Sequence, residues 1–395
     1  MTPASLPWIE RLVCLDTTSR DSNLALIEIV ADELRRHGIE PSIFPTPDGQ
    51  KANLVATIPA ADGNRTGGVV LSGHTDVVPV DGQPWSSEPF TPEIRDGRLY
   101  GRGTADMKSF IGVILTQLPE LVQARLSEPV HLAFTYDEEL GCLGGDAIVR
   151  EITELGIAPR LCFVGEPTSM RVIRAHKSSH VIDVAFHGVA VHSSLTPQGC
   201  NAIHHAATLI GFTRELAERW RDEGPYDEGY VVPYTTIGVN VIDGGIAGNT
   251  VPALCRLKLD YRTIAAVDPE EVLAGIRAKA AEIETAMQAE QPSARVEVSV
   301  AAAVPGLDNG PDSAAAALAA LLGAELSDDK VTYGTEAGQF AGIGVDTVVC
   351  GPGDIAQAHA PDEFIELGQI EECERFIAAL IGYLSEELSH LSEER

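Results

Sequence analysis

The sequence predicts an α/β protein with a doubly wound, mixed-sheet main domain and an inserted ferredoxin-like α+β domain. Three observations predict it. Short β-branched apolar runs alternate with helical segments in the N-terminal part of the chain, which is typical of a sheet covered by helices. The pattern then changes to β-α-β-β-α-β, and helix and strand units return near residue 303. We therefore expect one domain at residues 1–176 and 303–395, with residues 177–302 inserted into it.

Hydrophobic patterning places the elements of the main domain. A helix is expected at 21–40, with Asp21 or Ser22 at its start and Gly38 at its end. A long amphipathic helix at about 369–390 closes the chain. Apolar runs between these two helices predict buried strands at 53–59, 67–78, 130–138 and 160–167. Two further helices, at 108–126 and 141–155, are expected between these strands.

The inserted segment has its own succession of elements. Its strands are expected at 181–194, 234–245, 250–263 and 294–302, and its helices at 201–220 and 268–288. This order matches a small two-layer sandwich with a four-stranded sheet.

Composition narrows the classes of function. The formal net charge of −30 argues against binding to nucleic acid or to an anionic membrane, and it is compatible with a cationic or metal-dependent ligand. The seven cysteines are scattered and form no C-x-x-C pair, which favours reduced thiols. No signal peptide and no membrane-spanning run is apparent, so we expect a cytoplasmic protein.

Acidic and histidine residues gather where the predicted strands of the main domain end. In an open α/β sheet, the carboxyl ends of the strands form the ligand-binding edge. Any one of these residues alone is explained as a helix cap or a buried core histidine, but one cap per strand does not explain two imidazoles and paired carboxylates together. The residues are His74, Asp76, Asp106, Glu138, Glu139, Glu166 and His359.

Two imidazoles with several carboxylates form a nitrogen and oxygen ligand set without thiolate. This set suits Zn²⁺, with Co²⁺, Mn²⁺ or Ni²⁺ as substitutes. Carboxylates can also bridge two metals about 3.5–4 Å apart, as in two-metal hydrolytic sites. Asp76 lies two residues after His74, so its carboxylate could hold the second ring nitrogen of that histidine. One glutamate of the 138–139 pair could bind metal while the other acts as a general base.

Five motifs, in this order, resemble the M20 metallopeptidase family of dinuclear zinc amidohydrolases: "SGHTDVVP", "GRGTADMKS", "DEELGC", "GEPT" and "QAHAPDEF". The resemblance covers nearly the whole chain. Within the family, "DTTSRDSNL", "YGTEAGQF" and "GPGDIAQAH" are most similar to the acetylornithine deacetylases.

The resemblance implies a role for each residue of the cluster. His74 and Glu166 would bind one Zn²⁺, and Glu139 and His359 would bind the other; Co²⁺ could replace Zn²⁺. Asp106 would bridge the two metals, and Asp76 would orient His74. Glu138 would be the general base that activates the attacking water and passes the proton to the leaving amine.

The inserted segment resembles the lid and dimerisation domain of the family, which implies a homodimer. His192, in "AVHSSLTPQGCNAI", would polarise the scissile carbonyl, often from the partner subunit. Asn249 and Arg262 would hold the substrate carboxylate, a task that suits the guanidinium fork. Ser178 stands where the resemblance leads us to expect a glycine at the entrance to the lid, which leaves the hinge geometry open.

The activity implied is hydrolysis of N2-acetyl-L-ornithine to ornithine and acetate in arginine biosynthesis. The alternatives are a succinyl-diaminopimelate desuccinylase, a broad N-acyl-amino-acid deacylase and a dipeptidase. A non-catalytic binding protein of the same fold is disfavoured, because every ligand candidate and both glutamates of the 138–139 pair are present.

Overall fold

The computed structural model describes residues 2–385, and the chain divides into two compact units. Unit 1 holds the described residues of 1–175, 307–329 and 335–395, and unit 2 holds residues 176–306 and 330–334. The short segment 330–334, which the sequence placed in the main domain, belongs to unit 2. There Lys330 forms an ion pair with Asp227 at 2.7 Å, and the Arg262 guanidinium donates to the carbonyl oxygen of Thr332 at 3.2 Å.

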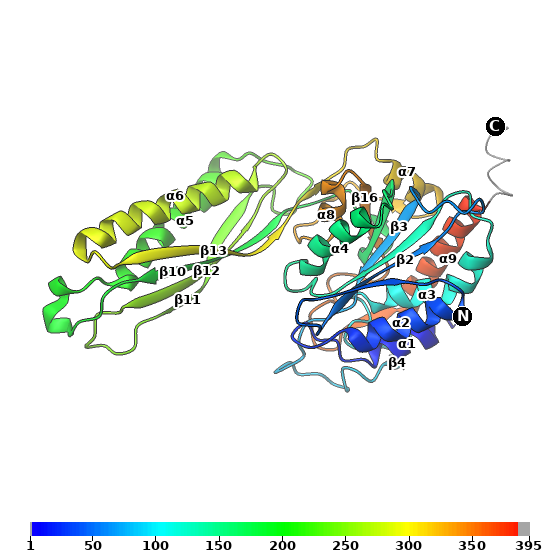
Figure 1. Cartoon of the computed structure of the whole chain (residues 1–395), viewed down its shortest axis with the longest axis horizontal. Helices are drawn as coiled ribbons and strands as arrows, with labels where there is room; N and C mark the ends of the chain where they lie inside the picture. Colours follow the sequence, from blue (N-terminus) through cyan, green and yellow to red (C-terminus); the bar gives the residue numbers. More distant parts are fainter. Residues whose placement is uncertain (1, 386–395) are drawn as a thin grey trace. The chain divides into compact units, whose positions relative to one another are not determined.

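Unit 1 is built on a six-stranded sheet in the order β1-β2-β6-β3-β7-β16 (Figure 1). The strands β6, β3, β7 and β16 run parallel, whereas β2 pairs antiparallel with both β1 and β6. The predicted mixed α/β sheet is therefore confirmed. The strands are β1 (Ser42–Pro45), β2 (Ala52–Ile58), β3 (Val69–His74), β6 (Val130–Thr135), β7 (Leu161–Pro167) and β16 (Asp346–Gly351).

Helices cover both faces of this sheet (Figure 1). One layer packs apolar side chains against the strands in the core of unit 1, and it consists of α1 (Leu6–Val13), α2 (Leu24–Arg36), α3 (Lys108–Gln123) and α9 (Leu367–Leu384). The opposite face carries α4 (Leu143–Glu154) and α8 (Ala337–Gly342), and α7 (Ala314–Leu321) packs near β16.

Short strands complete the unit. A three-stranded sheet has the order β17-β5-β4, with β4 (Glu93–Arg95), β5 (Arg98–Tyr100) and β17 (Phe364–Glu366). Two-residue strands form the pairs β15-β8 and β14-β9; they are β8 (Arg171–Val172), β9 (Ala175–His176), β14 (Leu307–Asp308) and β15 (Glu325–Leu326).

Unit 2 is an antiparallel four-stranded sheet in the order β11-β12-β10-β13, and two long helices cover it (Figure 1). Buried and partly exposed residues alternate along β10, so one face of the sheet packs against the helices. This is the predicted ferredoxin-like order. The elements are β10 (Ser179–His187), η1 (Ser193–Gln198), α5 (Ala202–Glu223), β11 (Thr236–Gly244), β12 (Leu254–Arg262), α6 (Pro269–Glu290) and β13 (Arg295–Val304).

Several boundaries differ from the prediction. Helix α2 begins at Leu24 after Asn23, rather than at Asp21 or Ser22, and Gly38 follows it with φ +79°. Strand β3 ends at His74, so Asp76 lies beyond the strand. Helix α9 ends at Leu384, and residues 386–390 of the predicted closing helix lie outside the described residues.

Ser178 needs no glycine-like backbone, because its φ is not positive. It is buried, and its hydroxyl lies 2.7 Å from the Thr263 hydroxyl and accepts from the Thr263 amide at 3.0 Å. The side chain therefore ties the start of β10 to the end of β12.

Two expectations concern the chain as a whole. All seven cysteines are free thiols. Within residues 2–385, none of the helices combines the length and the hydrophobicity needed to cross a membrane.

Candidate metal centre

Four of the predicted segments reach one edge of the central sheet. His74 is the last residue of β3, Glu138 and Glu139 follow β6, Glu166 lies in β7, and His359 follows β16. Asp106 comes from a different part of unit 1 than these residues. It follows β5 of the three-stranded sheet and precedes α3, so no strand of the central sheet delivers it.

The Asp106 carboxylate lies between the two imidazoles. Its Oδ1 is 2.8 Å from Nε2 of His74, and its Oδ2 is 3.2 Å from Nε2 of His359. The side chains of His74 and Asp106 are almost completely buried, whereas that of His359 is 53% exposed. One carboxylate thus contacts a buried and a solvent-accessible histidine, the arrangement that a bridging ligand requires.

A further carboxylate accompanies each histidine. Glu139 Oε2 is 3.0 Å from Nε2 of His359, and Glu166 Oε1 is 3.8 Å from Nε2 of His74. Glu166 Oε1 is buried and has no hydrogen-bond partner among the described residues. Potential ligand atoms converge in two overlapping groups that share His74, one with Asp106 and Glu139 and the other with Glu138 and Glu166.

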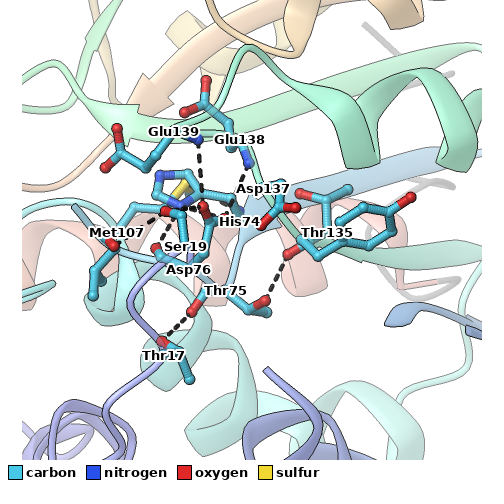
Figure 2. Close-up of polar contacts among 12 residues, drawn as sticks. Thr17, Ser19, His74, Thr75, Asp76, Met107, Thr135, Asp137, Glu138 and Glu139 are labelled. Atoms are coloured by element: carbon cyan, nitrogen blue, oxygen red, sulfur yellow. Dashed lines mark hydrogen bonds and ion pairs between the residues drawn. The ribbon is translucent and has the colours of Figure 1, made fainter. Parts of the chain in front are cut away.

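Asp76 contacts His74 through its backbone (Figure 2). The Nδ1 atom of His74 is 2.9 Å from the carbonyl oxygen of Asp76, whereas the carboxylate oxygen Oδ1 is 3.7 Å away. The expectation that the carboxylate holds this ring nitrogen is therefore not met. Because β3 ends at His74, the chain turns there and presents the carbonyl group instead of the side chain.

The Asp76 carboxylate organises the 138–139 turn. It accepts hydrogen bonds from the backbone amides of Glu138, at 3.0 Å, and Glu139, at 3.4 Å, and from the Ser19 hydroxyl at 2.7 Å. Figure 2 shows both amides directed toward this carboxylate while the two glutamate side chains point away from it. Ser19 lies in "DTTSRDSNL", a motif that the sequence singled out without assigning it a contact.

The carboxyl groups of the cluster are electrostatically unbalanced. Burial, with the charge of neighbouring Asp106, raises the pKa of Glu139 to about 7 and that of Glu166 well above its usual range. Burial likewise raises the pKa of Glu138, and Glu139 and Asp106 add to this effect. Hydrogen bonds to Asp106 and Glu139 raise the pKa of His359 to about 10. The pKa of His74 lies well above its usual range. Burial lowers this pKa, but the charge of Glu166 and the contact with Asp106 raise it by more.

These observations fit a site for divalent cations. Four carboxyl groups crowd around two imidazoles in a largely buried space, and one buried carboxylate oxygen has no partner. Positive charge placed among them would offset the burial and the mutual repulsion that together raise the glutamate pKa values. The donor set of imidazole nitrogen and carboxylate oxygen suits Zn²⁺ and the related first-row ions.

A buried ion pair that sequence reasoning missed holds the Asp106 loop. The guanidinium of Arg102 lies 2.7 Å from Oε2 of Glu363, and both side chains are 1% exposed. Oε1 of Glu363 accepts from the amides of Ala105, at 2.9 Å, and Asp106, at 3.1 Å. Both charged residues lie inside quoted motifs, "GRGTADMKS" and "QAHAPDEF", but no local pattern pairs positions 261 residues apart.

Unit 2 carries the other predicted site residues. His192 is exposed and precedes η1; its Nδ1 accepts from the Ser194 amide at 3.2 Å, which leaves Nε2 free to donate in the neutral ring. The backbone amide of Ser193 donates to the carbonyl oxygen of Asn249 at 2.9 Å, so His192 and Asn249 lie near each other. The Asn249 side chain is exposed.

Arg262 lies at the other end of the β11-β12 hairpin. It pairs with Thr236 at the start of β11, whereas Asn249 lies in the loop that follows β11 and precedes β12. The nine residues of β12 span roughly 27 Å. One copy of unit 2 therefore cannot place the side chains of Asn249 and Arg262 on the same carboxylate, although the sequence suggested that task for both.

Comparison with known proteins shows the family. The model of peptidase family M20/M25/M40 matches residues 70–383. The chain is 34% identical over 372 residues to an acetylornithine deacetylase of Proteus mirabilis, covering 93% of this chain and 91% of that protein. It is 35% identical over 365 residues to an acetylornithine deacetylase of Klebsiella pneumoniae, covering 92% and 91%.

Solved structures agree with this fold. An M20 metallo-carboxypeptidase from Sulfolobus solfataricus superposes with a TM-score of 0.76 at 17% identity, covering 95% of this chain and 98% of that one. A dinuclear metal-binding M20 peptidase from Bacillus subtilis superposes with a TM-score of 0.65 at 15% identity, covering 96% and 98%. The chain belongs to peptidase family M20/M25/M40 and is a metal-dependent hydrolase of amide bonds.

Proposed function

We propose that this hydrolase removes the acetyl group from N2-acetyl-L-ornithine to give ornithine and acetate, as a cytoplasmic step of arginine biosynthesis. The observation that carries the proposal is the identity of 34–35% to acetylornithine deacetylases over more than nine-tenths of both chains. The small, partly solvent-accessible cluster around Asp106 suits a small-molecule amide, and the free thiols are in line with a reducing compartment.

The cluster would hold two Zn²⁺ ions, with Co²⁺ able to replace them. We assign His74 and Glu166 to one ion, Glu139 and His359 to the other, and Asp106 to both. Bound ions of this kind supply positive charge that polarises an amide carbonyl and acidifies water. In the neutral ring, the Nδ1 proton that His74 donates to the Asp76 carbonyl leaves Nε2 with the lone pair that a metal ligand needs.

Glu138 is the proposed general base. Its carboxyl group lies beside the cluster, and burial together with the charge of Glu139 raises its pKa, so this group takes up a proton more readily than an exposed glutamate does. Oε1 of Glu138 lies 3.1 Å from the Cys142 thiol, which orients the carboxyl group. Glu138 would take the proton of the attacking water and give it to the departing amine nitrogen. Asp76 supports this step by holding the Glu138 amide.

We propose that residues of unit 2 complete the site in a homodimer. His192 would donate from Nε2 to the oxygen of the scissile carbonyl as negative charge develops there. Because Asn249 and Arg262 lie at opposite ends of β12, we propose that one of them acts with His192 from the second copy. Strand β11 is an edge strand with exposed Val241 and Ile242, the kind of surface that pairs with another chain.

The test is steady-state hydrolysis by Zn²⁺- or Co²⁺-loaded protein. The panel compares N2-acetyl-L-ornithine with N-succinyl-diaminopimelate, other acetylated amino acids and a dipeptide. We expect the highest kcat/KM for acetylornithine. In Glu138→Gln we expect kcat to fall by about 10²–10⁴-fold, the usual contribution of a general base, with the metal content retained.

Each other outcome points to a named alternative. A preference for the succinylated substrate would identify a desuccinylase, and broad activity would identify an N-acyl-amino-acid deacylase or dipeptidase. Either result would reject the acetylornithine assignment and keep the metal centre. If Glu138→Gln hydrolysed acetylornithine as fast as the parent protein, its role as general base would be wrong.

A further inference from the structure

Unit 2 carries a second group of potential metal ligands, outside the cluster described above. The Sγ of Cys200, a ring nitrogen of His205 and a carboxylate oxygen of Glu290 all lie within 4.8 Å of one another. They come from three elements. Cys200 follows η1, His205 lies in the first turns of α5, and Glu290 is the last residue of α6. The group therefore lies where the start of α5 meets the end of α6.

The backbone holds Cys200 rigidly. Its amide and its carbonyl each form a 3.0 Å hydrogen bond with Val189. A side chain at Gly188 would place its Cβ 2.1 Å from the carbonyl oxygen of Cys200, so that position accepts only glycine. Cys200 is 1% exposed and belongs to the apolar core of unit 2. The backbone of Cys200 is thus fixed before any ligand binds.

Of the other two members, Glu290 is exposed to solvent and His205 is largely buried. Nε2 of His205 lies 3.1 Å from Oε1 of Glu290, and the two side chains are 14% and 49% exposed. An ion can therefore reach the buried sulfur from the side of the carboxylate. The carbonyl end of α6, a helix of 22 residues, carries partial negative charge at this point and favours a cation.

A metal ion that binds Cys200 has to displace the proton of its thiol. Burial, with a hydrogen bond to Glu290 and the charge of that carboxylate, raises the pKa of Cys200 to about 11. The thiol therefore keeps its proton when no cation is present. A thiophilic cation would displace this proton, as it does at other cysteine ligands, and would then balance the thiolate and the carboxylate.

We propose that Cys200, His205 and Glu290 form a binding site for a zinc-like divalent cation that joins the start of α5 to the end of α6. Cysteine sulfur, histidine nitrogen and carboxylate oxygen are all ligands that Zn²⁺ takes in proteins. Zn²⁺ usually has four ligands, so three from the protein leave a fourth position for water. The proposal does not rest on the acetylornithine assignment, because these residues lie in unit 2 and the candidate catalytic ligands lie in unit 1.

Cobalt spectroscopy on the full-length protein tests the site. The metal-free protein is titrated with Co²⁺, and thiolate-to-Co²⁺ charge transfer is followed in the near ultraviolet. The ligands proposed for the catalytic centre are nitrogen and oxygen, so that centre contributes no such band. We expect one Co²⁺ per chain to produce the band and excess Zn²⁺ to remove it. Cys200→Ser should abolish the band, and the control Cys14→Ser, which changes the exposed cysteine of unit 1, should keep it.

Ligand variants keep the test decisive. His205→Gln and Glu290→Gln should each weaken Co²⁺ binding at this site by about tenfold or more. Absence of the charge-transfer band at saturating Co²⁺, the same band in Cys200→Ser, or unchanged Co²⁺ binding in both His205→Gln and Glu290→Gln would overturn the proposal.

Discussion

The Nδ1 atom of His74 lies 2.9 Å from the backbone carbonyl oxygen of Asp76. A carbonyl oxygen only accepts hydrogen bonds, so Nδ1 carries a proton, and in the neutral ring Nε2 has the lone pair that a metal ligand needs. The Asp76 carboxylate is thereby released for another task, which is to accept the amides of Glu138 and Glu139.

Because the backbone carbonyl and the carboxylate of Asp76 have different partners, the effect of Asp76→Asn can be predicted. The backbone carbonyl that orients His74 remains, so the metal content should stay close to that of the parent protein. The 138–139 turn loses its charged acceptor, so kcat should fall by about 10–100-fold, as is typical when a group that supports a metal site is changed. Steady-state kinetics with elemental analysis of bound metal checks this. If Asp76→Asn lost metal as readily as His74→Ala, the carboxylate would be the orienting group after all.

Ser19→Ala tests the same role of the Asp76 carboxylate with a milder change. It removes one hydrogen bond to the Asp76 carboxylate, at 2.7 Å, and leaves both amides in place. We expect a loss of about 1.5–3 kcal/mol of unfolding free energy, the usual value for a hydrogen bond to a charged group, and a smaller decrease in kcat than in Asp76→Asn. Urea unfolding and kinetics measure the two effects. A larger decrease in kcat than in Asp76→Asn would contradict the assigned order.

The buried Arg102–Glu363 ion pair predicts a large stability effect. Arg102→Met leaves the Glu363 carboxylate buried without its guanidinium partner, and such a loss costs about 3–5 kcal/mol of unfolding free energy. Because Glu363 also accepts the amides of Ala105 and Asp106, metal affinity should fall as well. Urea unfolding and metal titration measure both quantities.

An exposed ion pair nearby is the control. Arg98 and Glu366 are 2.8 Å apart on paired strands, but their side chains are 42% and 50% exposed. Arg98→Met should therefore cost less than about 1 kcal/mol. Equal effects of the Arg102 and Arg98 substitutions would show that the buried pair does not hold the loop.

Gly144 predicts a steric effect on the 138–139 turn. A Cβ at this position would lie 2.2 Å from the carbonyl oxygen of Tyr136, a backbone atom that cannot move without shifting the turn. Gly144→Ala should lower both kcat and the unfolding free energy. Gly368 of α9 has no atom within 4 Å of its Cβ position, so Gly368→Ala should preserve kcat. Kinetics and thermal unfolding of both variants check this, and equal activity would contradict the proposed contact.

His131 predicts a pH dependence of stability. Burial lowers the pKa of His131 to about 4, while its ring bonds Thr57 and the Gly67 carbonyl. The unfolded chain, with an ordinary histidine pKa of about 6.5, binds the proton first as the pH falls, so stability is lost from about pH 6.5 toward pH 4. Between pH 7.5 and pH 5 this histidine should account for about 2 kcal/mol of unfolding free energy.

Urea unfolding of metal-free protein at both pH values measures this loss. His131→Gln should lose about 2 kcal/mol less than the parent protein over this interval, and His204→Gln, which changes an exposed histidine of α5, should lose as much as the parent. A parallel loss in all three proteins would reject the role of His131.

Much of the fold was predictable because hydrophobic periodicity is local. The buried runs that became β2, β3, β6 and β7, and the alternation along β10, can be read from neighbouring residues. Element ends were less predictable. Helix α2 begins at Leu24, directly after Asn23, and the Asn23 side chain is held by hydrogen bonds to Ala52 and Thr75, which are distant in sequence.

By itself, the sequence determined which chemistry is present: two histidines and a set of carboxylates at strand ends, and motifs that match one family along the chain. The tertiary structure decided which atoms meet. It gave the His74 contact to the Asp76 carbonyl, paired Arg102 with Glu363, separated Asn249 from Arg262 by the length of β12, and brought Cys200 to Glu290. The physical reason is that residue types and periodicity are local properties, whereas these contacts depend on where the chain turns and on elements far apart in sequence.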